Sequence, residues 1–329
     1  MPKVITARVG SLVTILVLAA ALAGCSSGGG DDGRLRVAVS DPPLADLTRR
    51  VAGDALEVVG LVPLGADGHT YEPRPEDARK LAGAHLYIEN GLGLNDTVTA
   101  FARDALPEDT PMIALATTVP PQEIIPAESP DQIAAHGHAH VFNVHFWPDP
   151  VYAVGYVREI ERALSELDPT GAEGYRQRAG ALVAEIESLR TAIDAAVGTI
   201  PVANRKLVVY HDAWSYFGRR FGLPVVGAVQ PANFSEPSAS EVRATIQQVR
   251  QARVPAFFGS EVFPSDVLAA IAEETGARYY ADLSDDRLPG RPGDPEHGYV
   301  GMMVDNARAI VNALGGNAGA LDPVDPKKR

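Results

Sequence analysis

Short runs of apolar and β-branched residues alternate along the chain with segments of helical periodicity. This alternation is typical of parallel α/β proteins, in which helices cover the faces of a parallel sheet. Strands are predicted at Leu35–Val39, Leu56–Val62, His85–Glu89, Met112–Ala116, Leu207–Tyr210, Pro224–Gly227, Ala256–Phe258 and Arg278–Ala281. Helices are predicted at Leu44–Val51, Pro75–Leu81, Ala213–Phe221, Ala239–Gln251, Ser265–Thr275 and Tyr299–Leu314. The two sets of four strands predict two α/β lobes, each a small parallel sheet flanked by helices.

A long helix is predicted between the lobes. Asp168 is suited to the N-cap and Pro169 to the first helical position, and no proline follows until after Val197. One apolar stripe runs along it: Tyr175, Ala179, Leu182, Ile186, Leu189, Ile193 and Val197. A helix of roughly 30 residues would be about 40 Å long, enough to join both lobes and to limit their closure. The alternative is two shorter helices broken near Gly171 or Gly174. The predicted divisions are a first lobe at 34–167, the linking helix at 168–198 and a second lobe at 199–329.

The N-terminal segment has the pattern of a bacterial lipoprotein signal. Lys3 and Arg8 precede the apolar run Leu12–Ala21, which is shorter than the roughly 20 residues that span a bilayer. The run leads to Leu-Ala-Gly-Cys, which resembles a lipobox and predicts a signal peptide at 1–24 with lipid attached to Cys25. The alternative is an ordinary signal peptide with a chance cysteine. Serine and glycine then predict a flexible tether at 25–33. The protein is therefore expected outside the cytoplasm, anchored to the bacterial cell membrane.

Charge and cysteine content narrow the function classes. The formal net charge is -13 and becomes about -15 when Lys3 and Arg8 are removed with the signal. An acidic body with no basic stripe argues against a nucleic-acid partner and suits the collection of cations. The single cysteine excludes an intramolecular disulfide.

Three histidines and one aspartate are the candidate chemistry. His69 follows the second predicted strand, His211 ends the fifth, His145 lies in a long loop, and Asp282 follows the eighth strand. Ligands of parallel α/β sheets bind beyond the carboxyl ends of strands, so these side chains are placed to meet. Neutral imidazole suits zinc, copper, nickel and iron, and four nitrogen or oxygen donors suit tetrahedral zinc. Taken singly, each histidine is more typical of a structural, hydrogen-bonded residue than of a metal ligand, so the assignment depends on the flanking motifs.

The flanking motifs resemble a known family, the cluster A-I solute-binding proteins of zinc and manganese ABC importers. The motifs are Gly68-His69-Thr70-Tyr71-Glu72-Pro73, His145-Phe146-Trp147-Pro148-Asp149-Pro150, His211-Asp212-Ala213-Trp214-Ser215-Tyr216-Phe217, and Glu274-Thr275-Gly276 leading to Asp282. The resemblance extends from about Leu35 to Leu314 with the motifs in the expected order. Two positions depart from the family's Asp-Pro-His patterns: Gly68 precedes His69, which is expected to loosen that loop, and Val144 precedes His145.

The resemblance implies a monomeric, non-enzymatic metal-binding protein that serves the permease and ATPase subunits of an importer. It implies two lobes with the metal between them, held by His69, His145, His211 and Asp282. Manganese members tend to carry a carboxylate as the third ligand and zinc members a histidine. His211 therefore favours Zn²⁺ as the transported ion, with Mn²⁺ as the alternative.

A short histidine cluster, His136, His138 and His140, lies where zinc members of the family often carry a histidine-rich loop. It is a candidate accessory zinc site or a route that passes zinc to the main site. The alternative is a solvated loop without a defined site.

The remaining candidates support or lie outside the site. Glu72 and Asp212 are candidate hydrogen-bond partners of the neighbouring ligand imidazoles. His85, which opens a strand pattern, is expected to be structural, and His297, in a polar loop, to be solvent-exposed.

Three other functions remain open from the sequence. A metallohydrolase would need an open coordination position and a general base, and neither HExxH nor a two-metal carboxylate cluster is present. A surface adhesin would use the same fold for cell contact. A manganese or iron importer component would differ only in the ion that it carries.

Overall fold

The fold is described from a computed structural model, which covers residues 33–126, 142–230, 238–260 and 266–328. The chain separates into two units, Met1–Arg34 and the compact body Leu35–Arg329. Among the described residues, no helix combines the length and apolar character needed to cross a membrane.

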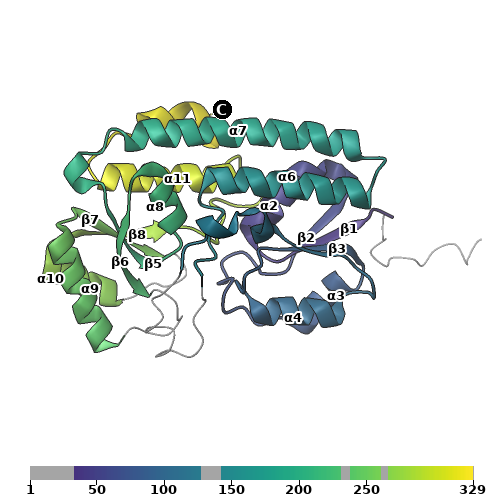
Figure 1. Ribbon diagram of the computed structural model, residues 1–329, viewed down its shortest axis with the longest axis horizontal. Coiled ribbons are helices and arrows are strands. Elements are labelled where there is room, and N and C mark those ends of the chain that lie inside the picture. Colours follow the sequence, from purple (N-terminus) through teal and green to yellow (C-terminus); the bar gives the residue numbers. More distant parts are fainter. Residues whose placement is uncertain (1–32, 127–141, 231–237, 261–265, 329) are drawn as a thin grey trace, which may run out of the picture. The chain divides into compact units, whose positions relative to one another are not determined.

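The body contains two four-stranded sheets in which every pair of neighbouring strands is parallel (Figure 1). The first sheet has the order β2-β1-β3-β4, with β1 Arg36–Val39, β2 Glu57–Gly60, β3 Ala84–Glu89 and β4 Met112–Ala114. The second has the order β6-β5-β7-β8, with β5 Leu207–His211, β6 Val225–Gln230, β7 Ala256–Ser260 and β8 Arg278–Leu283. Both sheets therefore repeat one topology, which confirms the predicted two-lobe parallel α/β fold.

Helices cover both faces of each sheet. They are α2 Pro42–Ala52, α3 Pro75–Leu81, α4 Asp96–Ala105, α6 Pro150–Leu167, α7 Ala172–Val197, α8 Ser215–Phe221, α9 Ala239–Ala252, α10 Asp266–Thr275 and α11 Tyr299–Ala313. Every predicted strand and helix named above is confirmed, with ends that differ by a few residues. No bounds were predicted for α4 and α6.

One hydrophobic core is shared by the two lobes. Val37 and Val39 of β1 belong to this core together with Val209 of β5, whereas Ala38 belongs to a separate core beneath α3 and α4. The alternation follows from the strand geometry, which turns successive side chains to opposite faces. α9 and α10 cover a corresponding separate core on the second sheet. Because the lobes share buried apolar surface, moving them apart would expose it to water, which favours the expected limited closure.

The linking helix begins later than predicted. Asp168 ends α6 instead of capping α7, and α7 occupies Ala172–Val197. The Asp168 carboxylate accepts hydrogen bonds from the Thr170 backbone (3.1 Å), the Thr170 hydroxyl (2.6 Å) and the Tyr175 hydroxyl (2.7 Å). These bonds stabilise a turn between the two helices, which contact each other along their lengths (Figure 1). The predicted apolar stripe of α7 is buried throughout.

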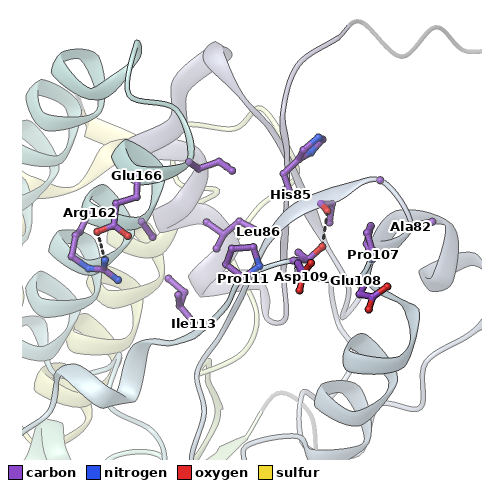
Figure 2. A pocket seen from close by; sticks show the side chains of 15 residues that line it. Ala82, His85, Leu86, Pro107, Glu108, Asp109, Pro111, Ile113, Arg162 and Glu166 are labelled. Atoms are coloured by element: carbon purple, nitrogen blue, oxygen red, sulfur yellow. Dashed lines mark hydrogen bonds and ion pairs between the residues drawn. The ribbon is translucent and has the colours of Figure 1, made fainter.

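A cavity of about 610 Å³ lies at the amino ends of β3 and β4 (Figure 2). His85 lines it together with Arg162 and Glu166 of α6. The Arg162 guanidinium is already ion-paired with Glu159 and Glu166, so its charge is satisfied within the protein. This cavity is at the opposite strand ends from those where ligands of parallel sheets bind.

Candidate metal centre

Three imidazoles from distant parts of the sequence meet beyond the carboxyl ends of the strands. His69 and His145 come from loops of the first lobe, and His211 is the last residue of β5 in the second. One ring nitrogen from each of the three lies within 4.8 Å of the others. The structure thus brings together the three histidines that the sequence selected.

The distances match a tetrahedral cation site. His145 Nε2 lies 2.8 Å from His69 Nε2 and 3.0 Å from His211 Nε2. Zinc–nitrogen bonds of about 2.0–2.1 Å place neighbouring donors about 3.3 Å apart in a tetrahedron, so shifts of a few tenths of an ångström would suffice. When all three Nε2 atoms are unprotonated, their lone pairs repel one another at these distances, and a shared cation relieves that repulsion.

A tight turn after β2 positions His69. The Asp67 carboxylate accepts hydrogen bonds from the His69 backbone N–H (2.8 Å) and the Thr70 hydroxyl (2.7 Å). The Asn95 side-chain amide donates to the Gly68 carbonyl. A Cβ atom at position 68 would lie 2.8 Å from Asp41 Oδ1, so a larger residue there would force the Asp41 carboxylate to shift. The glycine that replaces proline in the family's Asp-Pro-His pattern therefore lies in a turn with hydrogen bonds on both sides.

His145 is 4 % exposed and is held by Asn143. The Asn143 side-chain oxygen lies 3.1 Å from the His145 backbone nitrogen and 3.2 Å from His145 Nδ1. The indole of Trp147 packs beside the imidazole, with ring centroids 5.2 Å apart. A hydrogen bond on Nδ1 leaves Nε2 directed toward the other two histidines.

His211 is placed by the end of β5. It pairs with Gln230 in the β5–β6 ladder and is 5 % exposed. The next residue, Asp212, accepts 2.8 Å hydrogen bonds from the Ser215 hydroxyl, where α8 begins. Burial raises the pKa of Asp212, and the bond from Ser215 opposes that shift. Asp212 therefore organises the strand-to-helix turn, and among the described residues no hydrogen bond joins its carboxylate to the His211 ring.

The predicted fourth ligand requires a correction of the strand end. β8 extends to Leu283, so Asp282 lies within the strand and does not follow it, and its side chain is outside the described part of the structure. The residues beyond the strand are Ser284, Asp285 and Asp286. Asp285 Oδ2 lies 4.0 Å from His145 Nε2 and 3.9 Å from His211 Nε2. Asp286 groups with Asp67 and His69, with donor atoms within 4.8 Å of one another.

Further carboxylates make the first-lobe side of the centre acidic. Asp41 is 1 % exposed, and its Oδ1 has no hydrogen-bond partner among the described residues. Burial raises the pKa of Asp41 to about 7; the Ser40 hydroxyl opposes the shift, and the charges of Glu89 and Asp67 add to it. Burial also raises the pKa values of Asp67 and Glu89. Such a cluster of poorly solvated acids attracts a cation.

The structure agrees with only some of the predictions for the residues outside the three-histidine cluster. Glu72 is exposed, and within the described ranges no hydrogen bond joins it to His69. His85 has the expected structural contact, since its Nδ1 accepts from the Arg36 backbone at 3.1 Å, although its side chain is exposed. His297 is only partly exposed, because its Nδ1 lies 2.9 Å from the Pro289 carbonyl. His136, His138, His140 and Cys25 lie outside the described residues, so their roles stay predictions.

Sequence reasoning missed Asn143, Asp285 and Asp286. Asn143 stands two residues before a candidate ligand, which is a usable signal for a side chain that turns back onto the imidazole. The two aspartates were overlooked because the predicted strand ended two residues early. Periodicity locates strand ends only to within a few residues, and that error moves the site residue.

Comparison with known proteins identifies the relatives. The chain is 28 % identical to a manganese-binding lipoprotein, MntA, of Halalkalibacterium halodurans, over 91 % of this chain and 96 % of that protein. It is 27 % identical to the iron-binding protein YfeA of Yersinia pestis, over 86 % and 87 %. The Mn-bound periplasmic metal-binding protein of Candidatus Liberibacter asiaticus has a similar structure, with TM-score 0.73, 25 % identity and coverage of 85 % and 100 %. The fold also resembles the zinc-binding protein TroA of Treponema pallidum, with TM-score 0.76, 24 % identity and coverage of 86 % and 99 %.

The two-sheet fold and the converging imidazoles define the class. The protein is a metal-binding solute-binding component of an ABC importer, which is the class of the family whose model it matches. Residues 37–313 match the model of one family, and the chain belongs to it: the zinc-uptake complex component A periplasmic family, ZnuA.

Proposed function

We propose that this protein captures Zn²⁺ outside the cytoplasmic membrane and delivers it to the permease of its importer. The observation that carries the proposal is the convergence of three buried or half-buried imidazoles, with the Nε2 atoms of His69 and His211 each within 3.0 Å of His145 Nε2. Nitrogen donors favour zinc over manganese, which prefers oxygen. The cycle is capture and release without chemistry.

The proposed ligand set is His69, His145, His211 and a carboxylate from the Asp285–Asp286 turn. The two lobes both contribute, so their relative position sets the coordination geometry. Trp147, beside His145, donates a 2.8 Å hydrogen bond to the Asp285 carbonyl and thereby connects the turn to the first lobe. Release would follow when docking on the permease moves these elements apart. All donors come from one chain, which suits a monomer.

Manganese or iron is the second candidate cargo. Two buried aspartates beside the histidines offer oxygen donors, and the relatives compared include proteins named for manganese and for iron. Oxygen donors shift preference toward these harder ions.

Zinc and manganese are separated by competition. Protein stripped of metal and offered equimolar Zn²⁺ and Mn²⁺ should retain zinc, because the Irving–Williams order and three imidazoles both favour it. Inductively coupled plasma analysis of the washed protein measures the outcome, together with metal content after purification without added metal. Retention of manganese in both samples would replace zinc by manganese as the proposed cargo.

Attachment to the membrane through lipidated Cys25 is part of the proposal. It rests on the lipobox-like sequence, and the relative MntA is named a lipoprotein. In a bacterial host that processes lipoproteins, a Cys25→Ala variant should leave the membrane fraction or remain unprocessed, whereas the unaltered chain should fractionate with the membrane and label with a fatty-acid analogue. Equal labelling of the two proteins would contradict the assignment.

A further inference from the structure

We propose that Asn143 is a positioning residue that holds His145 in the Nδ1–H tautomer and connects this first-lobe ligand to the segment that carries His211. The inference rests on the proposed metal site and names a residue that sets its readiness to bind. Asn143 is 5 % exposed and lies outside regular secondary structure.

Two backbone partners fix the orientation of the Asn143 amide. The His145 backbone N–H, which can only donate, lies 3.1 Å from Asn143 Oδ1. The Asp212 carbonyl, which can only accept, lies 2.7 Å from Asn143 Nδ2. Exchanging the oxygen and nitrogen would break both bonds at once. The oxygen therefore faces His145 and the amino group faces Asp212.

The orientation of the amide decides the tautomer of His145. Asn143 Oδ1 also lies 3.2 Å from His145 Nδ1, and an amide oxygen can only accept. His145 Nδ1 must then carry the proton, which leaves the lone pair on Nε2. That nitrogen is the one at the centre of the histidine cluster, 2.8 Å from His69 Nε2 and 3.0 Å from His211 Nε2. Asn143 thus prepares the metal-binding nitrogen before any metal arrives.

The same amide connects the lobes next to the ligands. Its amino group binds the carbonyl of Asp212, the neighbour of His211, so one side chain contacts the supports of two ligands. The backbone carbonyl of Asn143 also accepts a 2.8 Å hydrogen bond from Tyr216 of α8. Movement of the second lobe away from the first would break both links. A carboxylate could accept from His145 but could not donate to Asp212, and an aliphatic side chain could do neither.

Two substitutions of Asn143 separate its contact with His145 from its contact with Asp212, and a third substitution elsewhere is the control. Asn143→Leu removes both hydrogen bonds at similar volume, while Asn143→Asp keeps the acceptor toward His145 and removes the donor. Asn90→Leu is the matched control, because Asn90 is buried and donates to the Val144 carbonyl at 3.0 Å without contacting an imidazole. Thermal unfolding of each variant shows whether it remains folded.

The tautomer is measured on metal-free protein by long-range ¹H–¹⁵N correlation of the histidine rings at a pH where they are neutral. His145 should be protonated on Nδ1 in the unaltered protein, in Asn143→Asp and in Asn90→Leu, and should become protonated on Nε2 to a measurable extent in Asn143→Leu. Retention of the Nδ1–H form in Asn143→Leu, or its loss in Asn143→Asp, would overturn the proposal. If the leucine variant does not fold, the aspartate variant still decides.

Zinc binding provides the second measurement. Asn143→Leu should weaken the affinity about 10- to 100-fold, the range seen when a partner of a ligand histidine is removed. Asn143→Asp should weaken it less and mainly through faster dissociation, because the connection to Asp212 is lost. An equal loss in Asn90→Leu and Asn143→Leu would reduce Asn143 to a packing residue. The unaltered protein tests the proposed function separately from the role of Asn143. If it fails to bind zinc, the proposed function is wrong. The tautomer measurement on metal-free protein still tests the role of Asn143 in that case.

Discussion

A His211→Ala variant is expected to lose tightly bound zinc, with an affinity at least 100-fold weaker than that of the unaltered protein. The loss of a donor should exceed the roughly 10- to 100-fold effect of losing a ligand's hydrogen-bond partner. His211 is 5 % exposed, and its Nε2 is 3.0 Å from His145 Nε2, so no solvent-exposed side chain can replace it without rearrangement. Native metal analysis beside a chelator competition titration measures the effect.

Two histidines outside the cluster provide matched controls for this experiment. His85→Ala and His297→Ala remove imidazoles that contact backbone groups elsewhere, at Arg36 and Pro289. Both variants should keep a full complement of zinc. A His211→Ala protein that also keeps tightly bound zinc would show that the site is wrongly assigned.

The same zinc-affinity measurement shows which of the aspartates near the histidines is a direct ligand. Asp285→Asn and Asp286→Asn are each expected to weaken zinc binding, and the larger effect identifies the direct ligand. Asp282→Asn should have little effect, because its position lies inside β8 and the turn with the carboxylates near the histidines begins after Leu283. A large loss in Asp282→Asn alone would restore the ligand that the sequence selected.

Zinc affinity is also expected to fall steeply with acidification, by about 10³-fold or more between pH 7.5 and pH 5. Imidazole binds metal only when neutral, so protons compete with zinc for each ligand. A histidine with the ordinary pKa of about 6.5 is neutral only about 3 % of the time at pH 5, which costs roughly 30-fold for each independent ligand. Three such ligands would give about 10⁴-fold.

The pH range of this loss distinguishes histidine ligands from carboxylate ligands of ordinary pKa. Affinity lost as the pH falls through 6.5 reports imidazole protonation, whereas ligands that are all carboxylates of ordinary pKa would keep their affinity down to about pH 4–5. Titration with a fluorescent zinc indicator at several pH values, with correction for the indicator's own protonation, measures the slope. His211→Ala should show a shallower slope because one proton competitor is gone. A flat affinity across this range would exclude a three-histidine site.

The sequence by itself determined the fold and the three histidines. Apolar runs and helical stripes depend on which positions are buried, and burial is a local, periodic property of a strand or helix. The apolar stripe of α7 and the strands of both sheets were therefore predictable. His69 and His211 were identified because parallel strands carry ligands at their carboxyl ends. His145 was a candidate because its long loop could reach the same cleft, and the flanking family motifs then assigned ligand roles to all three histidines.

Only the tertiary structure decided the rest. The start of α7 depends on where the Asp168 carboxylate points, toward Thr170 and Tyr175, and sequence patterns do not specify that direction. β8 continues two residues beyond its predicted end and includes Leu283, which pairs with Ser260. The turn after the strand therefore carries Asp285 and Asp286, and these replace Asp282 as the candidate carboxylates. Asn143 acquired its role from contacts with His145 and with Asp212, which is 69 positions away in the chain. Coordination requires atoms to meet within a few ångströms, and only the folded chain brings residues from both lobes to that distance.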